Sequence, residues 1–230
     1  MKRLVLLGEG HGEVFALPIL VKKLLLEKNA GEVLYLDRDV IRTSPTRLVK
    51  WDKASQQPDF SGWVSRVTLA ARRRDVGGVL AVYDGDAKKF PAGSANDFCA
   101  ATAAKLMAAA AARTGAGKLF SLCIVFACSE YETWLVAGAE SFAGRALNDG
   151  RIILPAQVKL PSSDHELRGK GWLEQNCVNY RPTRDQGALT ELLDFQFVRA
   201  KRLRSFARLE HTIEQLLEAI AKGRHISTPS

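Results

Sequence analysis

The chain has 230 residues, 47% of them hydrophobic and 25% charged, a composition that is typical of a globular protein with a substantial core. Lysine and arginine number 33 against 25 acidic residues, so the net charge is +8 and the pI is about 9.5. This basic balance favours polyanionic partners such as nucleic acid. The sequence lacks the run of roughly 20 apolar residues that a membrane helix needs, and its N-terminal apolar stretch is too short for a signal peptide. Its four cysteines form no C-x-x-C pair and are expected to be free thiols, so we expect a cytoplasmic protein without membrane attachment.

Strand and helix patterns alternate along the first 128 residues. Short apolar runs ended by glycine or acidic residues predict strands, and apolar residues at helical spacing predict helices. The predicted strands are residues 3–7, 32–37, 77–86 and 118–128, and the predicted helices are residues 13–27, 61–74 and 94–114. Between them, residues 38–60 are a polar, proline-containing connection. Since the strands are apolar throughout, we expect both faces of a parallel sheet to be covered in a three-layer α/β fold.

The pattern changes after residue 145. A loop-rich stretch is followed by two further helical patterns, at residues 189–193 and 203–220. We therefore predict an α/β domain over residues 1–145 and a helical and loop extension over residues 146–230. This extension would pack on the sheet or cover its active edge, and a single domain is the alternative.

Acidic residues follow three of the predicted strands. Ligands of open α/β sheets bind at the carboxyl ends of the strands, so these residues should share one edge. The residues are Glu9 and Glu13 after the first strand, Asp84 and Asp86 at the end of the third, and Glu130 and Glu132 after the fourth. Clustered carboxylates repel one another and need a proton or a cation, and oxygen ligands select Mg²⁺ or Mn²⁺. The alternative is that each acid is a solvated loop residue or, for Glu13 and Glu132, a charge at a helix N-terminus.

These motifs resemble a known domain. Glu9-Gly10 after an apolar strand, with Asp84-Gly85-Asp86 after a later one, resembles the TOPRIM domain of primases, topoisomerases and OLD-type nucleases. The chain is also similar to the TOPRIM-like domain of unknown function numbered 4276, whose members carry E-G-x-T-E, E-x-E-x-W/L and Y-x-K…G…SF. Here these are "EGHGE", "EYETW" and "NYRPTRDQGALTELLDFQFVRAKRLRSF", which together span nearly the whole chain. Gly12 stands where the family usually has threonine, so that hydroxyl is missing here while the carboxylates are kept.

The resemblance implies a TOPRIM-like, Rossmann-like sheet with a helical C-terminal extension. It also implies that Glu9, Asp84 and Asp86 form the catalytic and metal-binding group, in which the aspartates hold a divalent cation. The glutamate would be the general acid–base or a further ligand. Other acids at the same edge could serve a second metal position, and these are Glu13, Glu130 and Glu132. A bound cation would polarise a phosphodiester and stabilise the leaving oxygen.

Basic residues lie close to these motifs in the sequence. Phosphate contacts from lysine and arginine position a nucleic acid without reading its sequence. The candidates are Lys88 and Lys89, which follow Asp86, and Arg199, Lys201, Arg202 and Arg204, which form a basic run together with Arg208. A solvated helix face is the alternative interpretation of the run.

We therefore expect divalent-metal-dependent phosphodiester chemistry on DNA or RNA, in a defence or toxin–antitoxin context. One alternative is a non-catalytic subunit of the same fold that binds a protein encoded nearby. A less favoured alternative is a dinucleotide-binding protein, because three glycines within residues 8–12 follow a strand and Asp37 ends the next one. That fingerprint requires glycine at Glu13 and leaves Asp84 and Asp86 unexplained.

Overall fold

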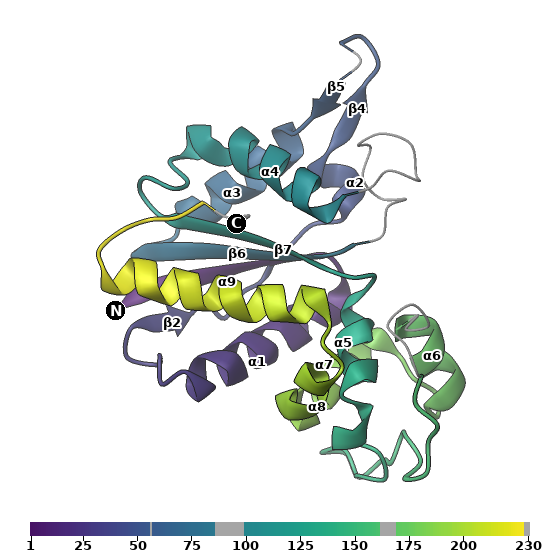
Figure 1. Ribbon diagram of the computed structural model, residues 1–230. Coiled ribbons are helices and arrows are strands. Elements are labelled where there is room, and N and C mark those ends of the chain that lie inside the picture. Colours follow the sequence, from purple (N-terminus) through teal and green to yellow (C-terminus); the bar gives the residue numbers. More distant parts are fainter. Residues whose placement is uncertain (56, 86–98, 162–168, 228–230) are drawn as a thin grey trace.

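The computed structural model describes residues 1–55, 57–85, 99–161 and 169–227, and of Pro45 and Thr46 the backbone alone (Figure 1). The strands are β1 (Lys2–Gly8), β2 (Leu34–Leu36), β3 (Ile41–Arg42), β4 (Lys50–Asp52), β5 (Gln57–Asp59), β6 (Val76–Asp84) and β7 (Ser121–Ala127). The helices are α1 (His11–Glu27), α2 (Pro45–Leu48), α3 (Ser61–Ala71), α4 (Ala100–Ala111), α5 (Tyr131–Ala137), α6 (Gly169–Asn176), α7 (Pro182–Leu192), α8 (Phe195–Ala200) and α9 (Arg204–Ala221). Short 3₁₀ turns are η2 (Ala112–Thr114) and η3 (Ala139–Ser141). None of the helices in these ranges is both long and apolar enough to cross a membrane.

The central sheet has the order β2-β1-β6-β7, with β3 pairing to β1 beyond β2, and every pairing in it is parallel. The expected α/β fold with a mostly parallel sheet flanked by helices is therefore confirmed. The chain goes from β1 to β2 on one side and reaches β6 on the other side of β1. Such a reversal in strand order opens a crevice at the carboxyl ends of the two central strands. In this sheet the crevice lies where β1 and β6 end.

Alternate residues of each strand point into two separate hydrophobic cores. Leu4 and Leu6 of β1 belong to the core beneath α1, α5, α7, α8 and α9, whereas Val5 and Leu7 belong to the core beneath α3 and α4. Figure 1 shows the same layering, with α3 and α4 above the sheet and α1 and α9 below it. Burial on both faces explains why the strands are apolar throughout.

The segment after residue 145 shares the larger of these cores. Helix α9 lies against β7, and the Phe206 ring is 5.8 Å from that of Trp134 in α5. Helix α7 lies along α1, where Gly187 is close to Phe15 and Ile19. Beyond α9 the chain returns to β7, where the Leu122 N–H donates to the Ile226 carbonyl at 2.8 Å.

Several elements differ from the expected ones. The connection over residues 38–60 contains β3, α2 and an antiparallel hairpin of β4 and β5. Just before α3, the Asp59 carboxylate accepts the N–H and the hydroxyl of Ser61, each at 2.8 Å. Helix α7 begins at Pro182, seven residues before the predicted start. The prediction missed its first turns because they are polar, and residues such as Asp185 and Gln186 are buried only through tertiary contacts.

Candidate functional site

Glu9 and Asp84 meet at the crevice between β1 and β6. The Asp84 N–H donates to Glu9 Oε2 at 3.4 Å, and Asp84 Oδ1 accepts the Tyr131 N–H at 2.9 Å. Tyr131 is the first residue of α5, which follows β7. These two hydrogen bonds therefore join the ends of three parallel strands, and they fix the Asp84 carboxylate against a helix N-terminus.

Glu13 is buried in the first turn of α1. Its Oε2 accepts the N–H of Gly10, and a Cβ at Gly10 would collide with this carboxylate. Burial raises the pKa of Glu13 to about 7, and the negative charges of Asp84 and Glu9 add to the rise. The glycine-rich turn thus lets the backbone fold closely over an acidic side chain.

Glu132 is the second buried acid of this edge, in the first turn of α5. Burial raises its pKa to about 7, and the charges of Glu13 and Glu130 contribute. The Tyr180 hydroxyl donates to Glu132 Oε1 at 3.4 Å. Glu130 lies just before α5, and its Oε2 accepts the Lys170 N–H from the start of α6 at 3.0 Å. The start of α6 and the loop before α7 therefore cover acids that lie tens of residues earlier in the sequence.

The acids at this edge of the sheet form one electrostatically coupled cluster. The described members are Glu9, Glu13, Asp84, Glu130 and Glu132, and they are coupled by mutual repulsion. Their oxygen donors have the chemistry that a hard divalent cation prefers. Within the described ranges no three His, Cys, Asp or Glu side chains already converge as a metal-holding group, and Asp86, the predicted third ligand, lies outside those ranges.

Tyr83 is a neighbour of the site that the sequence did not single out. Its side chain is buried beside Trp63, with ring centroids 6.3 Å apart. Its hydroxyl has no hydrogen-bond partner among the described residues. Burial raises the pKa of this hydroxyl, and the charge of Glu9 raises it further. The position just before Asp84 was the available sequence signal.

Gln186 packs against the glycine-rich turn. Its side chain is 1% exposed, and neither of its amide atoms has a partner in the described part of the chain. A Cβ at Gly12 would collide with the Gln186 amide oxygen and lie 3.0 Å from the Pro182 carbonyl. Gln186 therefore occupies the space into which any side chain at position 12 would extend, and Gly12 is required beside it.

Asp185 is fully buried and holds the start of α7 in place. Its carboxylate is 2.8 Å from an Arg151 guanidinium nitrogen and 2.7 Å from one of Arg184, and it accepts the Arg181 N–H at 2.8 Å. Burial by itself would raise the pKa of Asp185, but these donors outweigh it and hold the pKa below its usual range. This charge is balanced within the protein, so Asp185 contributes to structure.

The predicted nucleic-acid-binding residues fall into different environments. Arg199 pairs with Glu27 and, at 2.7 Å, with Glu210. Lys201 lies 3.2 Å from Glu140. These two bases therefore have partners within the chain.

The other predicted bases differ from that pair. Arg202 is exposed between α8 and α9 with φ of 55°, and Arg204 is exposed at the start of α9. Lys88 and Lys89 lie outside the described residues. Of the described bases in the run, Arg204 lies at the carboxyl edge of the sheet, beside Arg208.

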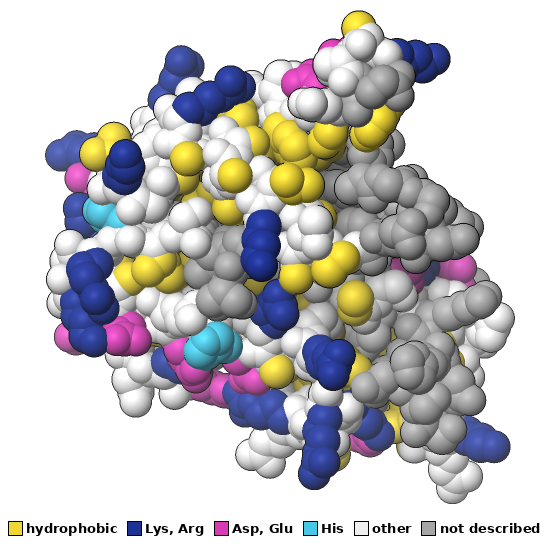
Figure 2. All heavy atoms as spheres, turned by 45° about the horizontal axis from the view of Figure 1, so that its top comes forward, with side chains coloured by type: hydrophobic (Ala, Val, Ile, Leu, Met, Phe, Trp, Pro, Cys, Tyr) yellow, Lys and Arg dark blue, Asp and Glu magenta, His cyan; other side chains and the backbone are white. Residues whose placement is uncertain are grey.

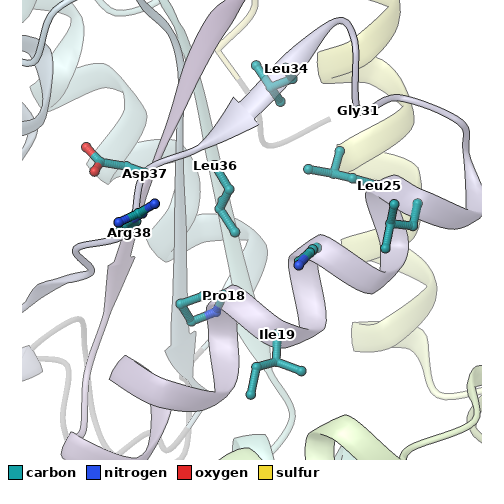
Figure 3. Close-up of a pocket in the computed structure, with 10 residues that line it drawn as sticks. Pro18, Ile19, Leu25, Gly31, Leu34, Leu36, Asp37 and Arg38 are labelled. Atoms are coloured by element: carbon teal, nitrogen blue, oxygen red, sulfur yellow. The ribbon is translucent and has the colours of Figure 1, made fainter.

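A cavity of about 430 Å³ lies between α1 and β2, away from the acids (Figure 3). Its lining is mainly apolar and consists of Pro18, Ile19, Lys22, Leu25, Leu26, Gly31, Leu34, Leu36, Asp37 and Arg38. Asp37 is buried, 3.1 Å from Arg3 and 3.8 Å from Arg73. These pairings give no support to the dinucleotide alternative, in which Asp37 would hold a ribose.

These features define an α/β protein with a mostly parallel sheet and clustered carboxylates at its carboxyl edge. The chain belongs to the family described as "Domain of unknown function (DUF4276)", whose profile matches residues 8–214. The resemblance to this family is thereby confirmed, and the matched range contains every residue of the acid cluster. Neither a curated protein nor a solved structure was found to match the chain.

Proposed function

We propose that this protein is a divalent-metal-dependent phosphodiesterase that acts on nucleic acid through a TOPRIM-like centre. The observation that carries the proposal is the meeting of Glu9 and Asp84 at the ends of β1 and β6, linked by the Asp84 N–H. Two buried acids with pKa values of about 7, Glu13 and Glu132, belong to the same cluster. Burial is the main cause of these raised pKa values, repulsion from neighbouring acids adds to it, and a bound cation would lower them.

The side chains divide into ligands and proton carriers. Glu9 and Asp84, together with Asp86, would hold Mg²⁺ or Mn²⁺. When bound, the cation would polarise the phosphodiester and neutralise charge on the leaving oxygen. Glu9 is the proposed general acid–base, and the Tyr131 N–H keeps the Asp84 carboxylate oriented.

The buried acids have a second role in this proposal. Glu13 and Glu132 titrate near neutral pH, so each can hold a proton or release it when a cation approaches. Together with Glu130 they could supply further carboxylate ligands for a second cation. The net charge of +8 supports a polyanionic substrate.

The test is cleavage of DNA and RNA oligonucleotides by the purified protein with Mn²⁺ or Mg²⁺. Glu9→Gln keeps the shape of the side chain and should lower the cleavage rate by about 10²- to 10⁴-fold. Glu32→Gln, an exposed acid before β2 at the opposite edge of the sheet, is the matched control and should leave the rate unchanged. Cleavage that persists in EDTA or in Glu9→Gln would contradict the proposal. Cation binding without any cleavage would favour the non-catalytic partner subunit.

A further inference from the structure

A second cavity, of about 210 Å³, lies at the carboxyl end of β7. Three elements form it: the start of α4, the end of β7 and the start of α9. The lining residues are Cys99, Ala100, Ala101, Ala104, Ile124, Phe126, Cys128, Arg204, Ser205 and Arg208, and no described residue among them is acidic. Pockets for drug-sized ligands start at roughly 300 Å³, so this cavity fits a small group and not a whole cofactor.

Two guanidinium groups and a hydroxyl give this cavity a donor-rich lining. Arg204 and Arg208 lie one helical turn apart on α9, both exposed, and neither pairs with an acid among the described residues. Ser205 is 8% exposed, and its Oγ accepts the Trp134 indole N–H at 2.9 Å, so its own proton can be donated into the cavity. A guanidinium group can donate two parallel hydrogen bonds to two phosphate oxygens. The first turns of α4 and α9 contain no acidic residue that would neutralise these arginines.

This cavity adjoins the acid cluster. Asp84 is the register partner of Ala127, and the Gly85 N–H donates to the Ala127 carbonyl at 2.6 Å. A Cβ at Gly85 would lie 3.3 Å from the sulfur of Cys128, which lines the cavity. Neighbouring strands are about 4.8 Å apart, so the cavity wall begins one strand away from Asp84. A polymer with regularly spaced phosphates that reaches the acids would bring another phosphate to this position.

We propose that the cavity at the end of β7 binds a phosphate group, held by Arg204, Arg208 and Ser205. In the substrate complex this is a backbone phosphate of the nucleic acid, beside the one at the acid cluster. The identification of this phosphate as part of a nucleic acid rests on the proposed function. The affinity for phosphate rests on the cavity itself, so the two can be tested apart.

The first experiment measures alkylation of Cys128 by iodoacetamide, followed by peptide mass spectrometry. Cys128 is exposed and lines the cavity, so a bound phosphate should shield it. With orthophosphate at about ten times its dissociation constant, labelling should slow about tenfold relative to chloride of equal ionic strength. The protection should disappear in Arg208→Gln. Equal labelling rates in phosphate and chloride would overturn the proposal.

The second experiment measures oligonucleotide binding in EDTA, where cleavage cannot interfere. Arg204→Gln and Arg208→Gln should each weaken binding about tenfold and lower the salt-dependence slope by about one. Arg113→Gln is the matched control, an exposed arginine in η2 just after the far end of α4, and it should bind like the wild type.

The outcomes separate the two proposals. If Glu9→Gln abolishes cleavage while phosphate leaves the labelling of Cys128 unchanged and both α9 variants bind oligonucleotide like Arg113→Gln, the phosphate site is wrong and the proposed function stands. If no cleavage is found but phosphate protects Cys128 and both α9 variants weaken oligonucleotide binding, the site stands and the nuclease assignment is wrong. Protection by orthophosphate with no change in oligonucleotide binding overturns the nucleic-acid source.

Discussion

Among the described residues, the carboxyl edge of the sheet has an acidic half and a basic half. In the half formed by β1 and β6, the adjoining helices α1 and α5 carry the buried acids Glu13 and Glu132 in their first turns. At the end of β7, α4 and α9 begin without an acid, and α9 carries Arg204 and Arg208. Figure 2 shows Lys and Arg side chains spread over one face of the molecule; the acidic side chains at its lower left are on the side of the N-terminus in Figure 1 and are not those of the carboxyl edge.

The comparison shows what the fold provides and what the side chains add. Both halves have the same backbone arrangement, a strand end beside helix N-termini. Helix N-termini stabilise nearby negative charge, so α1 and α5 partly offset the repulsion among the acids, and α4 and α9 remain available to an external anion. The acidic half therefore favours a bound cation and the basic half favours a bound anion. Metal-dependent cleavage of a phosphodiester uses both, a cation at the reacting phosphate and basic side chains that hold a neighbouring phosphate. The predictions below test whether the halves act separately.

The largest effect is expected for Asp84→Asn. Asparagine keeps an oxygen that accepts the Tyr131 N–H but removes the charge. Changing an outer-shell partner of a metal already costs 10- to 100-fold, so cation-dependent cleavage should fall by at least about 100-fold. Oligonucleotide binding in EDTA, measured by fluorescence anisotropy, should stay close to that of the wild type. If Asp84→Asn weakens binding as much as Arg208→Gln does, the two halves are not separate.

The next effect is a pH dependence of stability without divalent cations. The folded protein raises the pKa of Glu13 and Glu132 from 4.5 to about 7, so between these values it binds protons more tightly than the unfolded chain. The free energy of unfolding should therefore fall as pH rises from about 4.5 to 7, by up to about 3 kcal/mol for each carboxyl. Urea denaturation in EDTA measures this.

The matched control for this prediction is Glu132→Gln. An amide oxygen can still accept the Tyr180 hydroxyl, and no buried charge forms. This variant should lose part of the pH dependence and be more stable than the wild type at pH 8. Mn²⁺ should stabilise the wild type more at pH 8 than at pH 5.5, since the cation competes with the protons. A pH-independent stability in EDTA would contradict the burial of these charges.

A smaller effect is expected at the glycine-rich turn. Gly12→Thr forces its side chain into the space of the Gln186 amide and should destabilise the fold by about 1–3 kcal/mol. Gln186→Ala opens that space, so the double variant should be more stable than the sum of the two single changes implies. Thermal and urea unfolding of the wild type, the two single variants and the double variant gives the double-mutant cycle that measures this. Additive effects would show that the two side chains do not compete for one space.

The smallest effect is expected for Arg199→Gln. Arg199 pairs with Glu27 and Glu210 on the surface, and exposed ion pairs contribute about 0–1 kcal/mol. Stability should change within that range, and oligonucleotide binding should weaken far less than in Arg208→Gln. Equal weakening in the two variants would mean that the whole basic run contacts the polymer and not the cavity alone.

The order of β1, α1, β2, α3, β6, α4 and β7 and the location of the acids after the strands could be read from the sequence. Apolar runs that stop at glycine or aspartate are local signals, and parallel strands place their carboxyl ends at one edge. Glu9 and Asp84 could therefore be assigned to a common site without knowledge of the strand order. The family resemblance rested on the same short motifs, and its match over residues 8–214 is confirmed.

Tertiary structure decided the rest. The strand order β2-β1-β6-β7 made β1 and β6 neighbours, and the start of α6 and the loop before α7 buried acids far away in the sequence. Polar residues such as Gln186 become core residues only against α1, so no hydrophobic period marks them. The basic run looks uniform as a sequence, yet Arg199 and Lys201 pair with acids of the chain, Arg204 and Arg208 line the cavity, and Arg202 is exposed. Contacts between residues distant in the chain determine burial and charge pairing, so local patterns in the sequence do not predict them.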